Sequence, residues 1–294
     1  MFEKLIDILK NDPRKIVFPE GPDPRILEAT ARLHKDGFLT PVLVGNVEEV
    51  KAAAAAGNFD IEGVEIIDPA TYPEMDAMVE KMVELRKGKM SAEDCHKALL
   101  QSNYFGTMLV KMGKADALLG GATYSTADTV RPALQLIKTK PGNKIVSSCF
   151  IMVRGEEMLA MGDCAINITT DEDQLVEIAI ETARTAATFG IDPKVAKEMA
   201  PDLAIDGEMQ FDAAVAPEVG QLKFPGSPVA GYANTFIFPT IEAGNIGYKI
   251  AQRLGGFDAY GPILQGLNAP SNDLSRGCNA DEVYKMAIIT CAMV

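Results

Sequence analysis

The chain has 294 residues, of which 47% are hydrophobic and 23% charged, the composition of an ordinary globular protein at a length that usually holds two domains. Its 41 Asp and Glu against 28 Lys and Arg leave a formal charge of −13 at pH 7. Because broad binding of nucleic acid or of an anionic membrane needs a cationic surface, neither partner is expected. A bound anion must therefore be held by a few arginines and backbone amides.

The N-terminal segment and the cysteines favour a cytoplasmic location. No run of about 18 apolar residues is present to span a bilayer, and the segment from Met1 to Leu5 lacks the pattern of a signal peptide. The five cysteines are odd in number and form no Cys-x-x-Cys pair, so neither a disulfide framework nor a cysteine zinc site is predicted. His34 and His96 lack a nearby Cys or His and are interpreted as ordinary surface or half-buried residues, which predicts no metal site.

Short β-rich apolar runs alternate with amphipathic helical patterns through the first half of the chain. The helix at 24–36 shows both of its ends, with Asp23 and Pro24 at its start and Gly37 after its last turn. This alternation predicts an α/β fold with a mostly parallel sheet and helices on both faces. Strands are expected at 15–19, 40–45, 64–67 and 117–119, and helices at 24–36, 47–57, 73–87, 91–101, 104–113 and 127–137.

The pattern changes after a polar connector at 138–142. Strands at 144–153 and 158–165 with a short polar turn between them predict an antiparallel hairpin, so a boundary is placed near Gly142. Because the last block resembles the first in its alternation, the domains are expected to be 1–142 with 261–294, and 143–260. The other elements of this half are expected as helices at 173–189, 211–223, 243–254 and 281–291, and strands at 202–205, 235–238 and 261–266.

The first candidate site is the loop after a predicted buried strand. Gly120 and Gly121 let the backbone pass close to a ligand, and Ser125 and Thr126 supply hydroxyls at the start of a helix. Amides at a helix N-terminus, together with Arg131, could hold a phosphate or a carboxylate. The alternative is a capped turn in which Arg131 pairs with a neighbouring acid, and the residues alone do not decide between the two.

The second candidate is the loop that enters the last predicted helix. It carries a hydroxyl at Ser275, a guanidinium at Arg276, and acids at Asp281 and Glu282. An acid that removes a proton and a guanidinium that stabilises developing negative charge are what acyl transfer to or from a thiol requires. Helix capping by Asn279, with the acids favouring the helix dipole, explains the acids but leaves Ser275 and Arg276 unexplained.

A third segment, at 242–256, has two glycines at a helix start and cations in its later turns. Lys249 and Arg253 are four residues apart and share one helix face, where they either complement the helix C-terminus or point at a ligand. The residues alone favour the first reading. The Gly-x-Gly-x-x-Gly and Gly-x-x-x-x-Gly-Lys-Ser/Thr fingerprints are absent, so dinucleotide and P-loop sites lose their usual support.

These segments resemble the phosphate acetyltransferase family over nearly the whole chain. The resemblance implies reversible acetyl transfer between coenzyme A and inorganic phosphate, with coenzyme A as a substrate and no permanently bound cofactor, nicotinamide or metal. It also implies a two-domain, three-layer α/β/α fold like that of isocitrate and isopropylmalate dehydrogenases, an active site in the interdomain cleft, and a homodimer. The residues that carry it are STADTVRP at 125–132, EAGNIGYKIAQRLGG at 242–256, PILQGLN at 262–268 and DLSRGC at 273–278.

The resemblance also implies roles for single residues. Arg276 would polarise the acetyl carbonyl, and Ser275 would hydrogen-bond the coenzyme A sulfur. The family's proton acceptor is an Asp seven positions past that serine, where this chain has Glu282, so Glu282 is expected to be the base and Asp281 is the alternative. The substrate-binding residues would be Arg86 and Arg131, which hold the phosphate end, together with Arg253, Ser125, Thr126, Asn245 and Cys164. For Arg253 this replaces the helix-dipole role given above. The alternative for Cys164 is that it only fills space in the core.

Two departures and three rival functions remain. The family carries a longer segment near Ala196 and Lys197, so the chain is shortened there or a stretch is missing, and the abrupt break in alternation favours the second. Tyr124 stands where the family often has His.

A phosphate butyryltransferase shares the chemistry with a roomier acyl pocket. A non-catalytic binding protein on the same fold is disfavoured by the intact Ser275 and Arg276. A metal-dependent decarboxylating dehydrogenase is disfavoured because it would need clustered Asp ligands, which are not found in this sequence.

Overall fold

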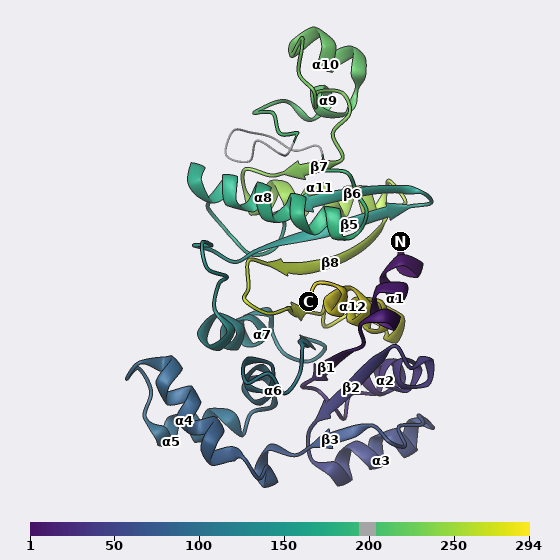
Figure 1. Ribbon diagram of the computed structural model, residues 1–294. Helices are drawn as coiled ribbons and strands as arrows, with labels where there is room; N and C mark the ends of the chain where they lie inside the picture. Colours follow the sequence, from purple (N-terminus) through teal and green to yellow (C-terminus); the bar gives the residue numbers. More distant parts are fainter. Residues whose placement is uncertain (194–203) are drawn as a thin grey trace. The chain divides into compact units, whose positions relative to one another are not determined.

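The computed structural model describes residues 1–193 and 204–294, which form two compact units (Figure 1). Unit 1 comprises 1–141 with 267–294, and unit 2 comprises 142–266. The predicted break near Ala196 and Lys197 lies outside the described residues, as does most of the predicted strand at 202–205. No helix in the described part of the chain is both long and apolar enough to cross a membrane.

Unit 1 is built on a five-stranded parallel sheet in the order β3-β2-β1-β4-β9. The α/β fold with a parallel sheet is therefore confirmed. The strands are β1 (Arg14–Phe18), β2 (Leu39–Val44), β3 (Glu65–Ile67), β4 (Ala117–Gly120) and β9 (Ser271–Asp273). The helices are α1 (Phe2–Asn11), α2 (Pro24–Asp36), α3 (Val47–Gly57), α4 (Met75–Arg86), α5 (Ala92–Leu99), α6 (Ser102–Lys111), α7 (Thr126–Pro132) and α12 (Ala280–Ala292), with a 3-10 turn at Pro69–Thr71 and a π-helical turn at Ala133–Ile137.

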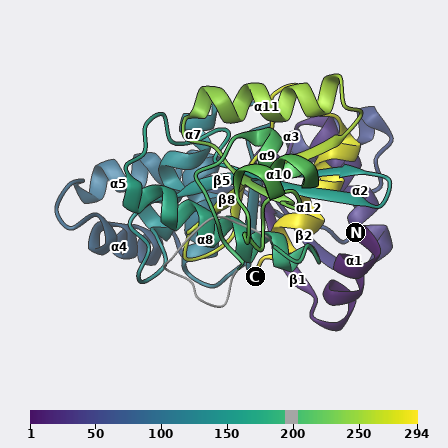
Figure 2. The ribbon, with the colours of Figure 1, turned by 90° about the horizontal axis from the view of Figure 1, so that it is seen from above.

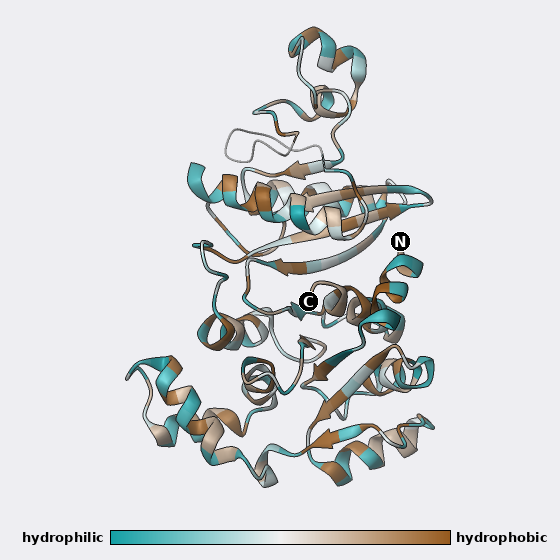
Figure 3. Cartoon of the chain, viewed as in Figure 1, coloured by the Kyte–Doolittle hydropathy of each residue, from teal (hydrophilic) through white to brown (hydrophobic). Residues whose placement is uncertain are grey.

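Local sequence fixes the ends of these elements. The Asp23 side chain accepts a hydrogen bond from the Arg25 amide at the start of α2, Pro24 takes the first helical position, and Gly37 ends the helix at φ 75°. The central strand is buried along Ile16 to Phe18, and β1 and β2 are largely hydrophobic in Figure 3. Helices α2 and α12 pack on one face of the sheet and α6 on the other, as Figure 1 shows.

The order of the strands alone indicates where a ligand site should lie in unit 1. From β1 the chain runs outward through β2 and β3, then crosses to the other side of β1 to form β4. The order therefore reverses between β1 and β4, and open parallel sheets bind ligands at the carboxyl ends of strands flanking such a point. The loops after β1, β4 and β9 all leave from that edge.

Unit 2 has a four-stranded sheet in the order β7-β6-β5-β8. The predicted hairpin is confirmed, because β5 and β6 pair antiparallel from Cys149 opposite Gly162 to Arg154 opposite Glu157. Helices α8 and α11 cover opposite faces of this sheet (Figures 1 and 2). The elements are β5 (Ser147–Arg154), β6 (Glu157–Gly162), α8 (Glu172–Thr188), α9 (Phe211–Val215), α10 (Pro217–Lys223), β7 (Thr235–Ile237), α11 (Ile241–Arg253) and β8 (Asp258–Gln265).

Several expectations need correction. The single helix expected at 211–223 is two helices, because Pro217 disfavours helical geometry at Ala216, which is extended at φ −108° and ψ 112°. The segment 261–266 lies in unit 2, because β8 pairs with β5 along its length. Ile205, which is described, belongs to no named strand. Helix α1 and strand β9 were not predicted, and β9, with sequence SND, has no apolar pattern to predict it from.

Candidate active site

The loop after β4 is held by a carboxylate from the loop after β1. The Glu20 carboxylate accepts hydrogen bonds from the amides of Ala122 and Tyr124, each at 3.0 Å, and from the Thr123 amide and hydroxyl. Glu20 is buried. The amides that precede α7 in this loop are thus occupied by the protein's own carboxylate, which fixes the loop's conformation.

The loop after β9 is fixed to the same place. The Leu274 amide donates to the Gly120 carbonyl at 2.7 Å, directly after the last β4–β9 pair, Gly120 with Asp273. Gly121 has φ +100°, and a Cβ there would lie 2.2 Å from Asp273 Oδ1. Only glycine fits this position, for reasons of both backbone conformation and space. The glycine pair therefore serves the packing of two loops.

Arg25 joins the two loops to the start of α2. Its guanidinium pairs with the Asp23 carboxylate and donates to the carbonyl of Ala122 at 2.8 Å. It also donates to the carbonyls of Arg276 at 2.8 Å and Cys278 at 3.2 Å. Four groups from three segments thus converge on one planar side chain, the arrangement that the guanidinium fork suits.

The loop so anchored presents Ser275 and Arg276 to solvent. Both residues are exposed, and the Ser275 hydroxyl accepts from the Gly277 amide at 3.2 Å. The Arg276 guanidinium makes no hydrogen bond or ion pair with the described residues. Cys278 is buried below them, and burial raises the pKa of its thiol to about 11 although Arg25 lowers it. Cys278 is therefore a packed thiol, and the Arg276 guanidinium is the group available to a ligand.

The α7 segment has the features of the capped turn. Ser125 caps the helix by accepting from the Asp128 amide at 3.2 Å, and its hydroxyl donates to the Asp128 carboxylate at 2.6 Å. Arg131 forms an ion pair with Asp128 at 3.4 Å, in which both side chains are about half exposed. Thr126 is exposed in the first turn. An exposed pair of this kind is weak, so Arg131 keeps access to an anionic ligand.

The two acids of the last helix differ in their surroundings. Asp281 forms ion pairs with Lys285 at 2.8 Å and Arg32 at 3.1 Å, and hydrogen bonding to Lys285 is the largest effect that lowers the pKa of Asp281. Glu282 completes a capping box, accepting from the Asn279 amide at 3.0 Å through Oε2. The capping interpretation of Asn279 is thus confirmed, and Glu282 Oε1 remains without a bond in the described structure.

The remaining predicted residues are placed as follows. Arg86 ends α4, and its buried Nε has no hydrogen-bond partner among the described residues. Arg253 and Asn245 lie on α11 in unit 2, and Arg253 is exposed. Cys164 belongs to the core of unit 2 with Phe150 and other apolar residues, and burial raises the pKa of its thiol. The filler interpretation of Cys164 is therefore the one the structure supports.

Three residues of this site were missed in the sequence. Glu20 lies in no segment that was singled out, and Asp273 opens the DLSRGC segment but was given no role; only the sheet brings both acids to the loop after β4. Arg25 could have been found from its position in the sequence. A cation in the first turn of a helix opposes the helix dipole, so an arginine there points to a role outside its own helix.

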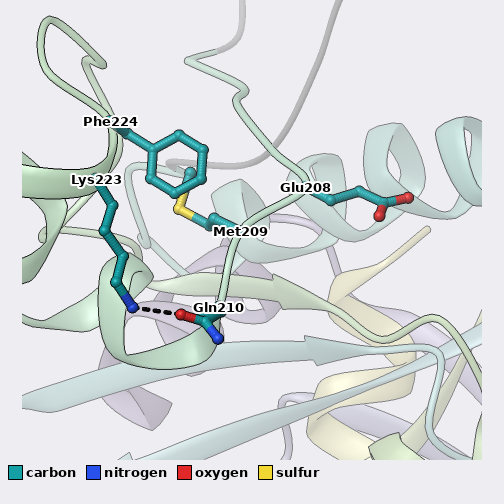
Figure 4. Close-up of a pocket in the computed structure, with 5 residues that line it drawn as sticks. All are labelled: Glu208, Met209, Gln210, Lys223 and Phe224. Atoms are coloured by element: carbon teal, nitrogen blue, oxygen red, sulfur yellow. Dashed lines mark hydrogen bonds between the residues drawn. The ribbon is translucent and has the colours of Figure 1, made fainter.

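Unit 2 contains a separate open hollow of about 460 Å³, next to α9 and α10 (Figure 4). The Phe224 ring and the Met209 side chain face each other there, Lys223 hydrogen-bonds Gln210, and the Glu208 carboxylate points away. None of the predicted site residues lines it. The hollow therefore adds nothing to the candidate active site.

Comparison with known proteins identifies relatives of this chain. A family model described as Phosphate acetyl/butaryl transferase matches residues 1–197 and 194–291. The phosphate acetyltransferase of Bacillus subtilis (strain 168) is 55% identical over 303 aligned positions, covering 95% of this chain and 94% of the relative. That of Staphylococcus epidermidis (strain ATCC 12228) is 48% identical over 318 positions, covering 98% and 97%. Since 318 exceeds the 294 residues of this chain by 24, at least that many aligned positions have no residue here.

Solved structures agree with these relatives. A phosphotransacetylase from Streptococcus pyogenes matches with a TM-score of 0.94 and 50% identity, covering 100% of this chain and 98% of that one. The EutD phosphotransacetylase from Staphylococcus aureus matches with a TM-score of 0.92 and 47% identity, covering 99% and 98%. A branched-chain phosphotransacylase from Enterococcus faecalis, with a TM-score of 0.67 and 17% identity over 95% of this chain and 98% of that one, shows the shared fold alone.

Proposed function

This chain belongs to the phosphate acetyl/butaryl transferase family, and we propose that it transfers an acetyl group reversibly between coenzyme A and inorganic phosphate. The observation that carries the proposal is the exposed Ser275 and Arg276 on a loop anchored by Arg25. An unpaired guanidinium on a fixed backbone is suited to stabilising an oxyanion. The relatives named for phosphate acetyltransfer favour acetyl over butyryl as the acyl group.

The reaction we propose is direct attack of the coenzyme A thiolate on the carbonyl carbon of acetyl phosphate. The new C–S bond forms a tetrahedral intermediate, which expels phosphate, and the reverse reaction begins with phosphate attacking acetyl-CoA. Arg276 stabilises the oxyanion of that intermediate, and Ser275 hydrogen-bonds the sulfur. Two anionic reactants are brought together in this step, and five further residues are assigned to hold them: Arg86, Arg131, Arg253, Asn245 and Ser125.

The proton acceptor in this scheme is Glu282. Its Oε1 has no bond to any of the described residues, whereas Asp281 is engaged by two cations that make it a weaker base. We expect Glu282→Gln to lower kcat by about 10²-fold or more, the range in which a positioned general base contributes. Gln can still accept from the Asn279 amide, so the capping box and the melting temperature should be preserved. Steady-state kinetics and thermal unfolding of the same preparation measure both.

Asp281→Asn is the matched variant for that experiment. It removes ion pairs that are partly exposed and should leave kcat close to that of the wild type. A large loss of kcat in Asp281→Asn with little loss in Glu282→Gln would reverse the assignment of the base.

The function itself is tested by phosphate-dependent release of free coenzyme A from acetyl-CoA, run beside butyryl-CoA with no metal or nicotinamide added. We expect rapid release that requires phosphate and prefers acetyl-CoA. Release from butyryl-CoA alone would move the chain to the butyryltransferase activity, and no release from either would contradict the proposed function.

We also propose a cytoplasmic homodimer. All five cysteines are unpaired, which suits a reducing compartment. Three apolar side chains four residues apart are exposed, two on α11 and one at its C-cap: Ile246 at 59%, Ile250 at 53% and Leu254 at 85%. Side chains at this spacing form one stripe on a helix, and an exposed apolar stripe favours a protein contact.

A charge on that stripe should therefore disrupt the dimer. We expect Ile250→Asp to shift the sedimentation coefficient from that of a dimer to that of a monomer. Ile8→Asp on α1 introduces the same charge at an isoleucine that is 47% exposed and should leave the mass unchanged. A dimer that survives Ile250→Asp at micromolar concentration would exclude the α11 stripe as its interface.

A further inference from the structure

Arg154 is a half-exposed arginine whose side chain contacts three other residues of unit 2. It ends β5 at the turn of the β5–β6 hairpin, and its Nη1 donates to the Gly255 carbonyl at 2.8 Å. Its Nε and Nη2 donate to the Glu157 carboxylate at 3.1 and 2.7 Å. The guanidinium carbon lies 4.3 Å from the centre of the buried Phe257 ring. All three nitrogens of the side chain are therefore engaged, which fixes its position.

The bond to Gly255 lies at the C-terminal end of α11. The helix ends at Arg253, and the amides of Leu254 and Gly255 both donate to the Ile250 carbonyl, at 2.9 and 3.1 Å. Carbonyl groups where a helix ends have no partner within the helix, and a cation there also complements the negative end of the helix dipole. Arg154 supplies a donor and a cation to this end from a neighbouring strand.

This contact changes the interpretation of Arg253. The spacing of Lys249 and Arg253 allowed two roles, in which the cations complement the helix C-terminus or point at a ligand. The cation bonded at the helix end is Arg154. Arg253 is exposed, and its guanidinium makes no hydrogen bond or ion pair with residues 1–193 or 204–294. The Arg253 guanidinium is therefore available to an anionic ligand.

The middle of α11 is fixed to the sheet without Arg154. The Tyr248 ring stacks on Phe150 of β5, with the ring centroids 4.0 Å apart and the planes 13° apart. Ala251 packs against the same apolar cluster. Arg253 lies two residues past Ala251 and so projects from the opposite face of the helix, away from the sheet. Its turn is held to the sheet by the bond that Arg154 makes just beyond it.

We propose that Arg154 is a positioning residue for substrate binding: by capping the C-terminal end of α11 it holds the last turn of that helix, so that the Arg253 guanidinium is presented to a phosphate group of a reactant. Terminal helical turns fray, and a side chain in a frayed turn must be ordered when its ligand binds. The bond from β5 meets that cost before the ligand arrives. This inference rests on the proposed function, because it assumes that Arg253 holds coenzyme A or acetyl phosphate, both of which carry phosphate groups.

The test compares Arg154→Ala with Arg253→Ala, with kcat and KM measured for both reactants. We expect Arg253→Ala to raise the KM of the reactant that it holds by about tenfold or more, the effect of one charge-assisted hydrogen bond. Arg154→Ala should raise the same KM by about fivefold, the contribution of a cation at a helix C-terminus, and should leave kcat near that of the wild type. The reactant whose KM rises identifies the phosphate group that Arg253 contacts.

The double variant separates positioning from an independent effect. Without Arg253 there is nothing left to position, so adding Arg154→Ala to Arg253→Ala should raise the KM no further. A wild-type KM in Arg154→Ala would overturn the proposal. An increase from Arg154→Ala that persists undiminished in the absence of Arg253 would overturn it as well.

Two further measurements test the helix cap itself. Glu157→Gln removes the half-exposed ion pair but keeps the bond to Gly255, so it should retain the wild-type KM. Hydrogen–deuterium exchange in Arg154→Ala should be faster than in the wild type over 250–257 and unchanged over 241–248. Unchanged exchange over 250–257, or a KM in Glu157→Gln as high as in Arg154→Ala, would show that the cap does not position Arg253.

Failure of this inference differs from failure of the proposed function. If Arg253→Ala has the wild-type KM for both reactants, Arg253 holds neither of them and the role of Arg154 falls with it, while acetyl transfer by the wild type still stands. A wild-type protein with no acetyl transfer would instead contradict the proposed function.

Discussion

Replacing Arg276 with alanine is expected to lower kcat by about 10²–10³-fold, the cost of removing one oxyanion-stabilising donor, while leaving the affinity for coenzyme A largely intact. The side chain is exposed and has no partner within 1–193 and 204–294, so its loss should not disturb folding. The loop also stays in place, because Arg25 bonds the backbone carbonyl of residue 276 and not its side chain. Steady-state kinetics beside equilibrium binding of coenzyme A separates the two effects.

Two further variants sharpen the result for Arg276. Arg276→Lys keeps the charge but loses the planar fork and should recover only part of the rate. Arg184→Ala removes another exposed arginine, on α8, which pairs with the buried Glu181, and should keep the wild-type kcat while losing stability. An equal loss of kcat and of coenzyme A affinity in Arg276→Ala would show that Arg276 binds substrate and does not stabilise the transition state.

Arg25→Ala is expected to have the second large effect, on both stability and rate. The change leaves the Asp23 carboxylate and the carbonyls of Ala122, Arg276 and Cys278 without their shared donor. Because the bonds to Asp23, Ala122 and Cys278 are partly buried, we expect a loss of about 2–3 kcal/mol in the free energy of unfolding. The loop with Ser275 should also lose its fixed position, lowering kcat by tenfold or more, in line with about 1.4 kcal/mol of lost positioning.

Urea unfolding measures the loss of stability in Arg25→Ala, and the kinetic assay measures the loss of kcat. Arg25→Lys retains the charge but cannot reach three segments at once, so it should remain impaired in both. Arg32→Ala removes a neighbouring arginine of α2, which pairs with the half-exposed Asp281 and lies 4.2 Å over the Tyr284 ring, and should cost less than Arg25→Ala. Wild-type stability and rate in Arg25→Ala would mean that the two loops hold their positions without it.

The resemblance to the family carried the functional prediction further than the residues did. Spacing alone favoured a helix-dipole role for Arg253 and left the role of Arg131 undecided. The structure shows why Arg131 was undecided, because α7 has a capped first turn and Arg131 pairs with Asp128. The acids of α12 satisfy the capping interpretation and still leave one carboxylate oxygen of Glu282 unused. A local pattern can thus serve structure and chemistry together, and spacing does not separate the two.

The sequence by itself determined what depends on near neighbours in the chain. The bounds of α2 and α3, the hairpin of β5 and β6, and the cap at Asn279 follow from periodicity and end signals within a few residues. Only the tertiary structure decided that Glu20, Arg25 and Asp273 belong to one site. Glu20 and Arg25 follow β1 and Asp273 ends β9, and parallel pairing of these strands with β4, which leaves no local signature, brings the three residues together.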